Sequence, residues 1–200
     1  MATYQNSRYN IALPSGSGGN LVHIKTLTAS SSGTLSFVDG ASDVVLDNTY
    51  RTYIFKFINI HPATDDTHFQ VNFRDGDTNY DATKQTTFFD SYHTEADDSA
   101  AAGYAGAADL TLSTGSQRLA VHIGNDNDQS ASGEMFLFNP SSTTFVKNFI
   151  SRSHTNRSSN GAFSAFVGGY CNVTAAIDGV QFAMSSGNID SGTIKLYGIA

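Results

Sequence analysis

The alternation of apolar and polar residues at every second position constrains the fold of this chain more than any other feature. Residues 68–74, HFQVNFR, place three apolar side chains on one side of the backbone and four polar side chains on the other. Because successive side chains of a β-strand point to opposite faces of a sheet, this pattern is typical of a half-buried strand. Residues 50–60, YRTYIFKFINI, are β-branched and aromatic, and HPATDD at 61–66 supplies turn residues between the two runs. We therefore expect residues 50–60 and 68–74 to form an antiparallel pair.

The same alternation recurs along the chain, and turns rich in Gly, Ser, Asn and Asp separate the runs. Short strands with such turns between them indicate a sandwich or a barrel. The last two runs flank SSGNIDSG at 185–192, and we expect them to form a closing hairpin. The expected fold is an all-β, antiparallel β-sandwich of about ten short strands with almost no helix. Further strands are expected at 21–29, 34–38, 43–47, 85–92, 118–123, 133–138, 144–151, 161–171, 177–184 and 192–199.

One segment carries a weak helical pattern. Residues 96–110, ADDSAAAGYAGAADL, are rich in alanine, but they also contain Gly103 and Gly106. A glycine in a helix interior costs about 1 kcal/mol relative to alanine. We therefore predict a long loop here, with room for one helical turn, that either crosses the surface or contacts a partner.

The length of 200 residues fits one domain with a sizeable core. Residues 1–20 lack periodicity, and they contain the Gly- and Ser-rich segment PSGSGG at 14–19. We predict an N-terminal arm at 1–20, flexible or ordered by a neighbouring subunit, and a single β-sandwich domain at 21–200.

The charge composition bears on the partners of the chain. Only 14% of the residues are charged, against about 25% in an average domain, and the net charge is −7. The basic residues are scattered, so a phosphate backbone would be repelled and nucleic acid is not an expected partner. No apolar stretch approaches the length of a membrane span, and MATYQNSRYNIAL lacks a secretory signal pattern. We expect synthesis in the host cytoplasm and no membrane partner.

One acidic loop resembles a cation site. Its oxygen-bearing residues stand at alternate positions, as in a Ca²⁺-binding loop. Tyr80, however, stands where the helix–loop–helix calcium motif needs glycine, and Thr86 stands where it needs a bidentate glutamate. The alternative is a solvated turn, so we keep Ca²⁺ only as a weak candidate and otherwise expect no cofactor. The candidate ligands are Asp75, Asp77, Asn79 and Asp81.

No catalytic motif is present in the sequence. The six histidines are spread along the chain without zinc-site spacing, and there is no nucleophile elbow, P-loop or dinucleotide fingerprint. The single cysteine, Cys171, lies among apolar residues and is interpreted as a small buried side chain rather than a nucleophile. We expect no catalytic residues and no enzymatic activity.

Several large side chains are candidates for subunit contacts. Tyrosine is favoured at interfaces because it is large, stiff and amphipathic. Most phenylalanines alternate inward and are interpreted as core, whereas several tyrosines lie in predicted loops. The interface candidates are Tyr4, Tyr9, Leu13 and Tyr104.

Three segments resemble a group of small β-rich structural proteins of tailed bacteriophages. They are IFKFINIHPATDDTHFQVNF at 54–73, FLFNP at 136–140 and MSSGNIDSGTIKLYGIA at 184–200, with a Gly-, Ser-, Thr- and Ala-rich middle segment before FLFNP. The resemblance covers about residues 50–200. It implies a virion component with a jelly-roll-like sandwich, either a capsid decoration protein or a protein of the tail or fibre. No catalytic residues are implied.

These observations lead to one expected function and two rivals. We expect a non-enzymatic virion structural protein, a capsid decoration or cement protein that contacts the major capsid protein or tail components. A homo-oligomer is expected, with a trimer as one candidate. The first rival is a tail- or fibre-associated adhesin that binds host surface glycan. The second is a glycan depolymerase, which would need two carboxylates facing each other across a cleft.

Overall fold

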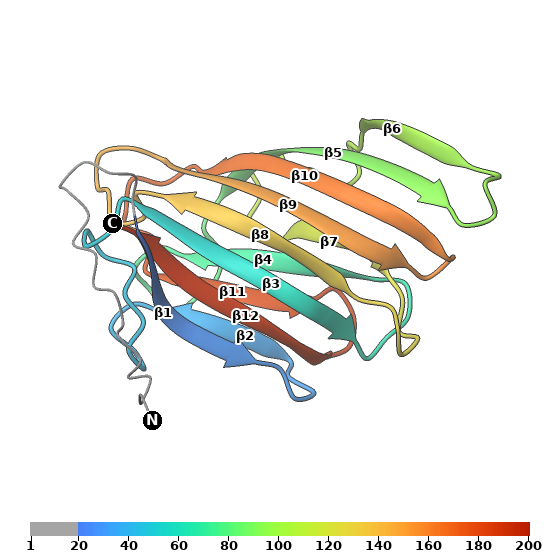
Figure 1. The fold of residues 1–200 in the computed structure, drawn as a ribbon. Helices are drawn as coiled ribbons and strands as arrows, with labels where there is room; N and C mark the ends of the chain where they lie inside the picture. The colour runs from blue at the N-terminus through green and yellow to red at the C-terminus, as the bar shows by residue number, and fades with distance from the viewer. Residues whose placement is uncertain (1–19) are drawn as a thin grey trace, which may run out of the picture.

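The computed structural model describes residues 20–200, which form two antiparallel β-sheets packed face to face (Figure 1). The large sheet contains, in spatial order, β1 (Leu21–Thr28), β12 (Ile189–Ile199), β3 (Thr52–Pro62), β8 (Ala131–Phe138), β9 (Lys147–Arg157), β10 (Gly161–Cys171), β5 (Lys84–Thr94) and β6 (Ala100–Tyr104). The small sheet contains β2 (Thr34–Val38), β11 (Gly179–Met184), β4 (Thr67–Arg74) and β7 (Gln117–Ile123). The predicted all-β antiparallel sandwich is confirmed.

The two sheets are joined at one edge. A single pair, Ile123 with Arg157, connects β7 of the small sheet to β9 of the large one. Beyond this junction the large sheet continues through β10, β5 and β6, which have no partner strand in the small sheet. None of the residues from 20 to 200 lies in a helix, so this stretch contains no helix that could cross a membrane.

The centre of the core is a group of aromatic rings from both sheets. Phe182 of β11 packs against Phe55 and Phe57 of β3 in the opposite sheet, with ring centroids 5.4 and 5.3 Å away. Its neighbours in the small sheet are Phe69, stacked at 5.6 Å, and Phe37 at 6.2 Å. All five side chains are buried. This group therefore holds the sheets together where the alternating apolar residues of four strands converge.

Two predicted hairpins are wrong, although their turns are correctly placed. β3 pairs with β12 and β8, and β4 pairs with β11 and β7, so residues 50–60 and 68–74 lie in different sheets. β11 and β12 likewise belong to different sheets. The two connections cross between the sheets side by side, and the backbone N–H of Ala63 donates to the carbonyl of Asn188 at 3.0 Å. Alternation shows that one face of each strand is buried, but it does not show which strand lies at each edge.

Two further predictions about strands are wrong. Residues 43–47 do not form a strand, because Ser42 and Asp43 have positive φ values of 50° and 65° that turn the chain. Residues 96–110 contain a strand, β6, where a loop was expected. β6 pairs only with β5, at the free edge of the large sheet, and all five of its residues are exposed. A strand in that position needs no large side chains, so its alanines and Gly103 are tolerated.

The aromatic core gives the first testable prediction. Phe182→Ala should lower the free energy of unfolding by about 3–5 kcal/mol, because it leaves a cavity between the sheets. Phe145→Ala is the control, since Phe145 is 70% exposed in the loop between β8 and β9, and it should change stability by less than about 0.5 kcal/mol. Urea denaturation measures both. Equal losses in the two variants would contradict the central position of Phe182.

Candidate functional site

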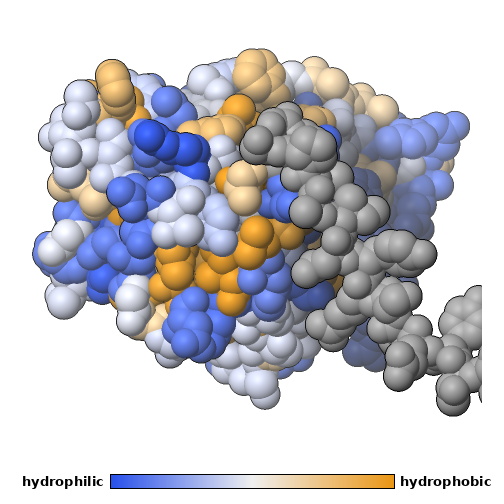
Figure 2. Space-filling model, turned by 60° about the vertical axis from the view of Figure 1, so that its left-hand side comes forward, coloured by the Kyte–Doolittle hydropathy of each residue, from blue (hydrophilic) through white to orange (hydrophobic). Residues whose placement is uncertain are grey.

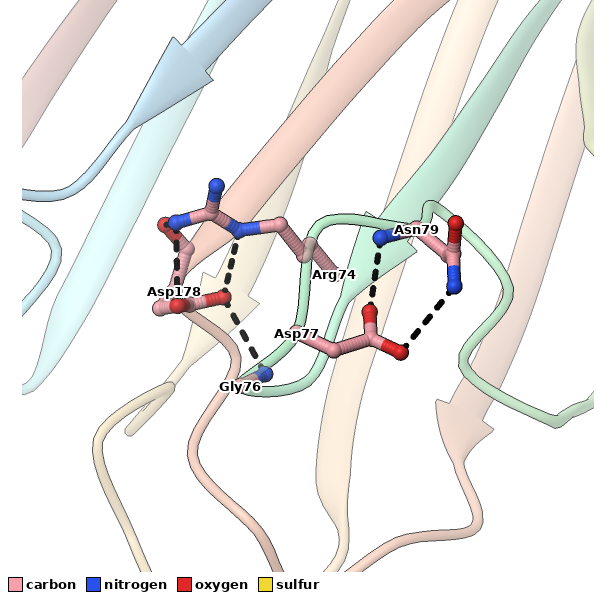
Figure 3. Close-up of polar contacts among 5 residues, drawn as sticks. All are labelled: Arg74, Gly76, Asp77, Asn79 and Asp178. Carbon is pink, nitrogen blue, oxygen red and sulfur yellow. Dashed lines mark hydrogen bonds and ion pairs between the residues drawn. The ribbon is translucent and has the colours of Figure 1, made fainter.

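The acidic loop predicted as a cation site follows β4 and is fixed to the connection between β10 and β11 (Figure 3). Arg74, the last residue of β4, forms a bidentate ion pair with Asp178, with Nε–Oδ1 and Nη2–Oδ2 distances of 2.9 Å. The backbone N–H of Gly76 donates to the same carboxylate at 3.3 Å. Within the loop, Asp77 accepts hydrogen bonds from the backbone N–H and the side-chain amide of Asn79. Hydrogen bonds within the loop and to Asp178 therefore hold its conformation.

Two buried lysines lie at the base of this loop. Lys84 of β5 and Lys147 of β9 flank Cys171 of β10 in register, and all three side chains are buried. The Lys84 ammonium donates to the side-chain oxygen of Asn72 and to the carbonyl of Ala82, and the Lys147 ammonium donates to the carbonyl of Val173. Burial lowers the pKa of Lys84 to about 8 and lowers that of Lys147.

The chemistry of Cys171 follows from the same burial. Burial raises the pKa of its thiol to about 12, and the positive charges of the two lysines oppose this only in part. A thiol that stays protonated and is closed off from solvent is a poor nucleophile. The structure therefore places Cys171 in the core, as its apolar surroundings in the sequence indicate.

The acidic residues of the loop have a structural explanation. The carboxylates of Asp75, Asp77 and Asp81 lie within 4.8 Å of one another, close enough to share a cation. The negative charges of Asp75 and Asp81 also raise the pKa of Lys84, and that of Asp75 raises the pKa of Lys147. The loop thus supplies counter-charge to two buried ammonium groups. Calcium binding by this loop remains a prediction, and exposed acidic groups alone do not establish it.

A second candidate site lies on the outer face of the large sheet. Four side chains from four neighbouring strands are between 50% and 54% exposed: Ile150 of β9, Phe166 of β10, Phe89 of β5 and Tyr104 of β6. Phe166 is opposite Phe89, and Phe89 is opposite Tyr104, so three of the four form one row across the strands. We call these four residues, with Phe136 and Phe138 of β8, the apolar face.

Five of the six residues of the apolar face, all except Tyr104, line a groove of about 810 Å³. Phe136 is opposite Ile150, so β8 and β9 form one wall, and Phe166 with Phe89 forms the other. Figure 2 shows that the surface of this protein mixes polar and apolar areas, with apolar residues gathered in patches. Apolar patches with polar residues at their rim are typical of interaction sites.

Charged residues border the groove on one side. Glu134 of β8 forms ion pairs with Lys56 of β3, at 3.4 Å, and with Arg152 of β9, at 2.6 Å. Lys195 of β12 stands opposite Lys56 in the neighbouring strand. Of these four residues, here called the rim, Glu134 and Arg152 line the groove, and Lys56 and Lys195 lie next to them on β3 and β12. Together they carry a charge of +2 on a chain whose net charge is −7.

Of the four predicted interface residues, one is described by the structure. Tyr104 lies on the apolar face, where its ring packs against Phe89 at 5.3 Å and its hydroxyl donates to Asp109. Tyr4, Tyr9 and Leu13 lie outside the described residues. Phe89, Phe136 and Phe166 are not among the predicted interface residues, because most phenylalanines are interpreted as core. The runs FF at 88–89 and FLF at 136–138 could have revealed the first two, since adjacent apolar residues place apolar surface on both faces of a strand.

A third candidate site, here called the polar pocket, lies at the open edge of the sandwich. It has a volume of about 250 Å³ between β7 and the inner face of β5, β10 and β9. Its polar lining residues are Asp90 and Tyr92 of β5, Arg118 and His122 of β7, and Arg157 of β9. No local sequence pattern predicts this pocket, because three strands far apart in the chain supply these five residues.

A histidine pair lies beside the polar pocket. His122 Nδ1 is 2.8 Å from an oxygen of Asp66, and the backbone N–H of His122 donates to Nδ1 of His68 at 3.2 Å. His68 therefore accepts at Nδ1 and is neutral. Burial lowers the pKa of His68 to about 4, and the positive charges of Arg118 and His122 act in the same direction. The hydrogen bond from His122 lowers the pKa of Asp66.

Comparison of the chain with protein-family models, curated proteins and solved structures finds no match.

The acidic loop gives the second prediction. Asp75→Asn should lower the free energy of unfolding by about 1 kcal/mol, because it removes counter-charge from two buried lysines. Asp126→Asn, in the exposed turn after β7, should have no measurable effect. Denaturation at neutral pH measures both variants. An unchanged stability in Asp75→Asn would contradict the proposed role of the loop.

The histidine pair gives the third prediction. Between pH 6.5 and about 4 the unfolded chain protonates residue 68, whereas the folded protein does not, so stability should fall as the pH falls through this range. His68→Asn keeps an acceptor for the backbone of His122 but has no titrating ring. Its stability should depend less on pH in urea denaturation at pH 7, 6, 5 and 4.5. His154→Asn, at an exposed position of β9, is the control and should retain the wild-type slope.

Proposed function

We propose that this protein is a non-enzymatic structural component of a bacteriophage particle that acts by protein–protein contact. The observation that carries the proposal is the apolar face, which exposes large side chains from four adjacent strands around a groove. The resemblance of residues 50–200 to small phage structural proteins supports the virion assignment. Within that class we propose capsid decoration, in which the partner is the major capsid protein. If the protein instead belongs to the tail, the partner is another tail component.

We propose a neighbouring copy of this chain as the occupant of the apolar face. The rim of the groove carries a charge of +2, so the remainder of the chain carries −9, because the total is −7. A basic rim beside an apolar groove fits an acidic surface, and the remainder of a second copy has an excess of acidic residues. A contact between two different surfaces of the same chain closes into a ring when the rotation between neighbouring copies permits it, and a trimer is the smallest such ring.

The energy of the apolar face indicates that other contacts contribute. Covering a half-exposed large apolar side chain contributes about 1 kcal/mol, so the four most exposed members contribute about 4 kcal/mol. Association costs about 4–15 kcal/mol in lost translational and rotational freedom. The apolar face alone is therefore marginal. We propose that the arm at 1–20 supplies the additional contacts that attach the protein to the particle.

A second candidate function is a tail- or fibre-associated adhesin that binds host surface glycan. The observation that favours it is the polar pocket, whose size and hydrogen-bonding groups suit a sugar unit better than a protein surface.

The apolar face gives the fourth prediction. The double variant Phe89→Ser, Phe166→Ser should shift sedimentation from oligomer towards monomer while the melting temperature stays near the wild-type value, because both side chains are already half exposed. Phe145→Ser, which removes an exposed ring outside the groove, should leave the oligomer intact. Wild-type protein that sediments as a monomer at all concentrations would refute the proposed oligomer. Deleting residues 1–19 separately tests attachment, since binding to purified particles should be lost.

A further inference from the structure

We propose that the polar pocket binds a carboxylate-bearing sugar. Two guanidinium groups, those of Arg118 and Arg157, line the pocket. Among the described residues, the side chains of Arg118 and Arg157 form no ion pair and no hydrogen bond to another residue. A guanidinium presents a planar set of donors that matches a carboxylate in a bidentate arrangement. Two unpaired guanidiniums on one pocket of an acidic protein mark a site for an anionic group.

The arginine of β9 is held in place before any ligand binds. Its guanidinium lies over the ring of Tyr92, 5.1 Å from the centroid, and 5.8 Å from the centroid of Phe163. These two rings are stacked nearly parallel, with an interplanar angle of 4°. A donor group that is already ordered loses little conformational entropy on binding. Arg157 therefore provides a fixed donor, and the partly exposed Arg118 faces it from β7.

The other polar groups of the pocket specify a ligand with hydroxyl groups. Asp90 lines the same pocket, and it forms no ion pair with either arginine. A bare phosphate or sulfate would be repelled by this carboxylate, whereas a sugar hydroxyl can donate a hydrogen bond to it. When Nδ1 of His122 donates to Asp66, Nε2 of the ring is left as a second acceptor. A ligand with one carboxylate and several hydroxyls satisfies all four groups.

The shape of the pocket agrees with one sugar unit. Ala105, Ala107 and Ala108, from the loop after β6, form part of its wall, and their short side chains leave the space open. The volume of about 250 Å³ is comparable with that of one sugar unit. The alanine-rich stretch does not form a helix. Its small side chains instead keep the pocket open.

The backbone at His122 is also unusual. Its φ value is 56°, in the left-handed region that a non-glycine residue rarely adopts, although it lies within β7. The register between β4 and β7 shifts at the same place, with Phe69 opposite Ala120 and Thr67 opposite Ile123. Strained residues of this kind concentrate at binding and catalytic sites. Here the distortion places the ring of His122 between Asp66 and the pocket.

This inference does not depend on the proposed role in assembly. The pocket uses the inner side of β5, through Asp90 and Tyr92, whereas the apolar face uses the outer side, through Phe89. A copy docked on the outer face would leave the pocket accessible. The two proposals can therefore fail separately.

Isothermal titration of the full chain with glucuronate tests the proposal. Saturable binding is expected at millimolar ligand, and Arg118→Gln should weaken it by about 10- to 100-fold, because a charge-assisted contact to the carboxylate is lost. Arg51→Gln, at an exposed position outside the pocket, is the control and should bind as the wild type does. Thermal melts of both variants establish that they are folded.

Three comparisons decide the chemical class of the ligand. Glucose, which lacks the carboxylate, should bind at least 10-fold more weakly than glucuronate, and inorganic phosphate should bind weakly as well. Binding of glucose as tight as that of glucuronate would overturn the role of the arginines. Tighter binding of phosphate would overturn the role of Asp90. The absence of any binding of glucuronate or N-acetylneuraminate to the wild type would overturn the proposal as a whole.

Discussion

The structure depends on the packing of two sheets of unequal width around shared aromatic rings. The small sheet has four strands and the large sheet has eight, so the small sheet can cover only part of the inner face of the large one. Phe182 and its neighbours fill the region where both sheets are present. Beyond β7, the loop after β6 lies at the inner face of β5 and β10, where its residues Ala105, Ala107 and Ala108 line the polar pocket. The polar pocket lies at this boundary because the paired region of the sandwich ends there.

The same inequality explains the apolar face. A strand in a sandwich usually has one apolar side, yet β5, β8 and β10 carry large apolar side chains on both. Phe88 is buried and Phe89, the next residue, is half exposed. Soluble monomers rarely expose an apolar surface of this kind, because contact between apolar side chains and water is unfavourable. Strands with large apolar side chains on both faces therefore support the proposed contact of this sheet with a partner.

The sequence predicted the positions of the strands better than their partners. Residues 34–38 and 161–171 were predicted with their observed bounds, since alternation and glycine-rich turns are local signals. The pairing of β3 with β8 and β12 involves residues far apart in the chain, for which alternation carries no information. For the same reason, one candidate site could be predicted from the sequence and another could not. The acidic loop is continuous in sequence and was identified, whereas Arg118 and Arg157 converge only after folding.

Charge placement connects the three sites. The chain has few basic residues, and six of them lie in pairs at the three candidate sites. Lys84 and Lys147 are buried against the acidic loop, Lys56 and Arg152 flank Glu134 beside the groove, and Arg118 and Arg157 line the pocket. Of these three pairs, only that of the pocket has no carboxylate or backbone oxygen bound to it. In a protein with a net charge of −7, two guanidinium groups at one recess, without a carboxylate partner among the described residues, are the basis of the proposal that the pocket binds an anionic ligand.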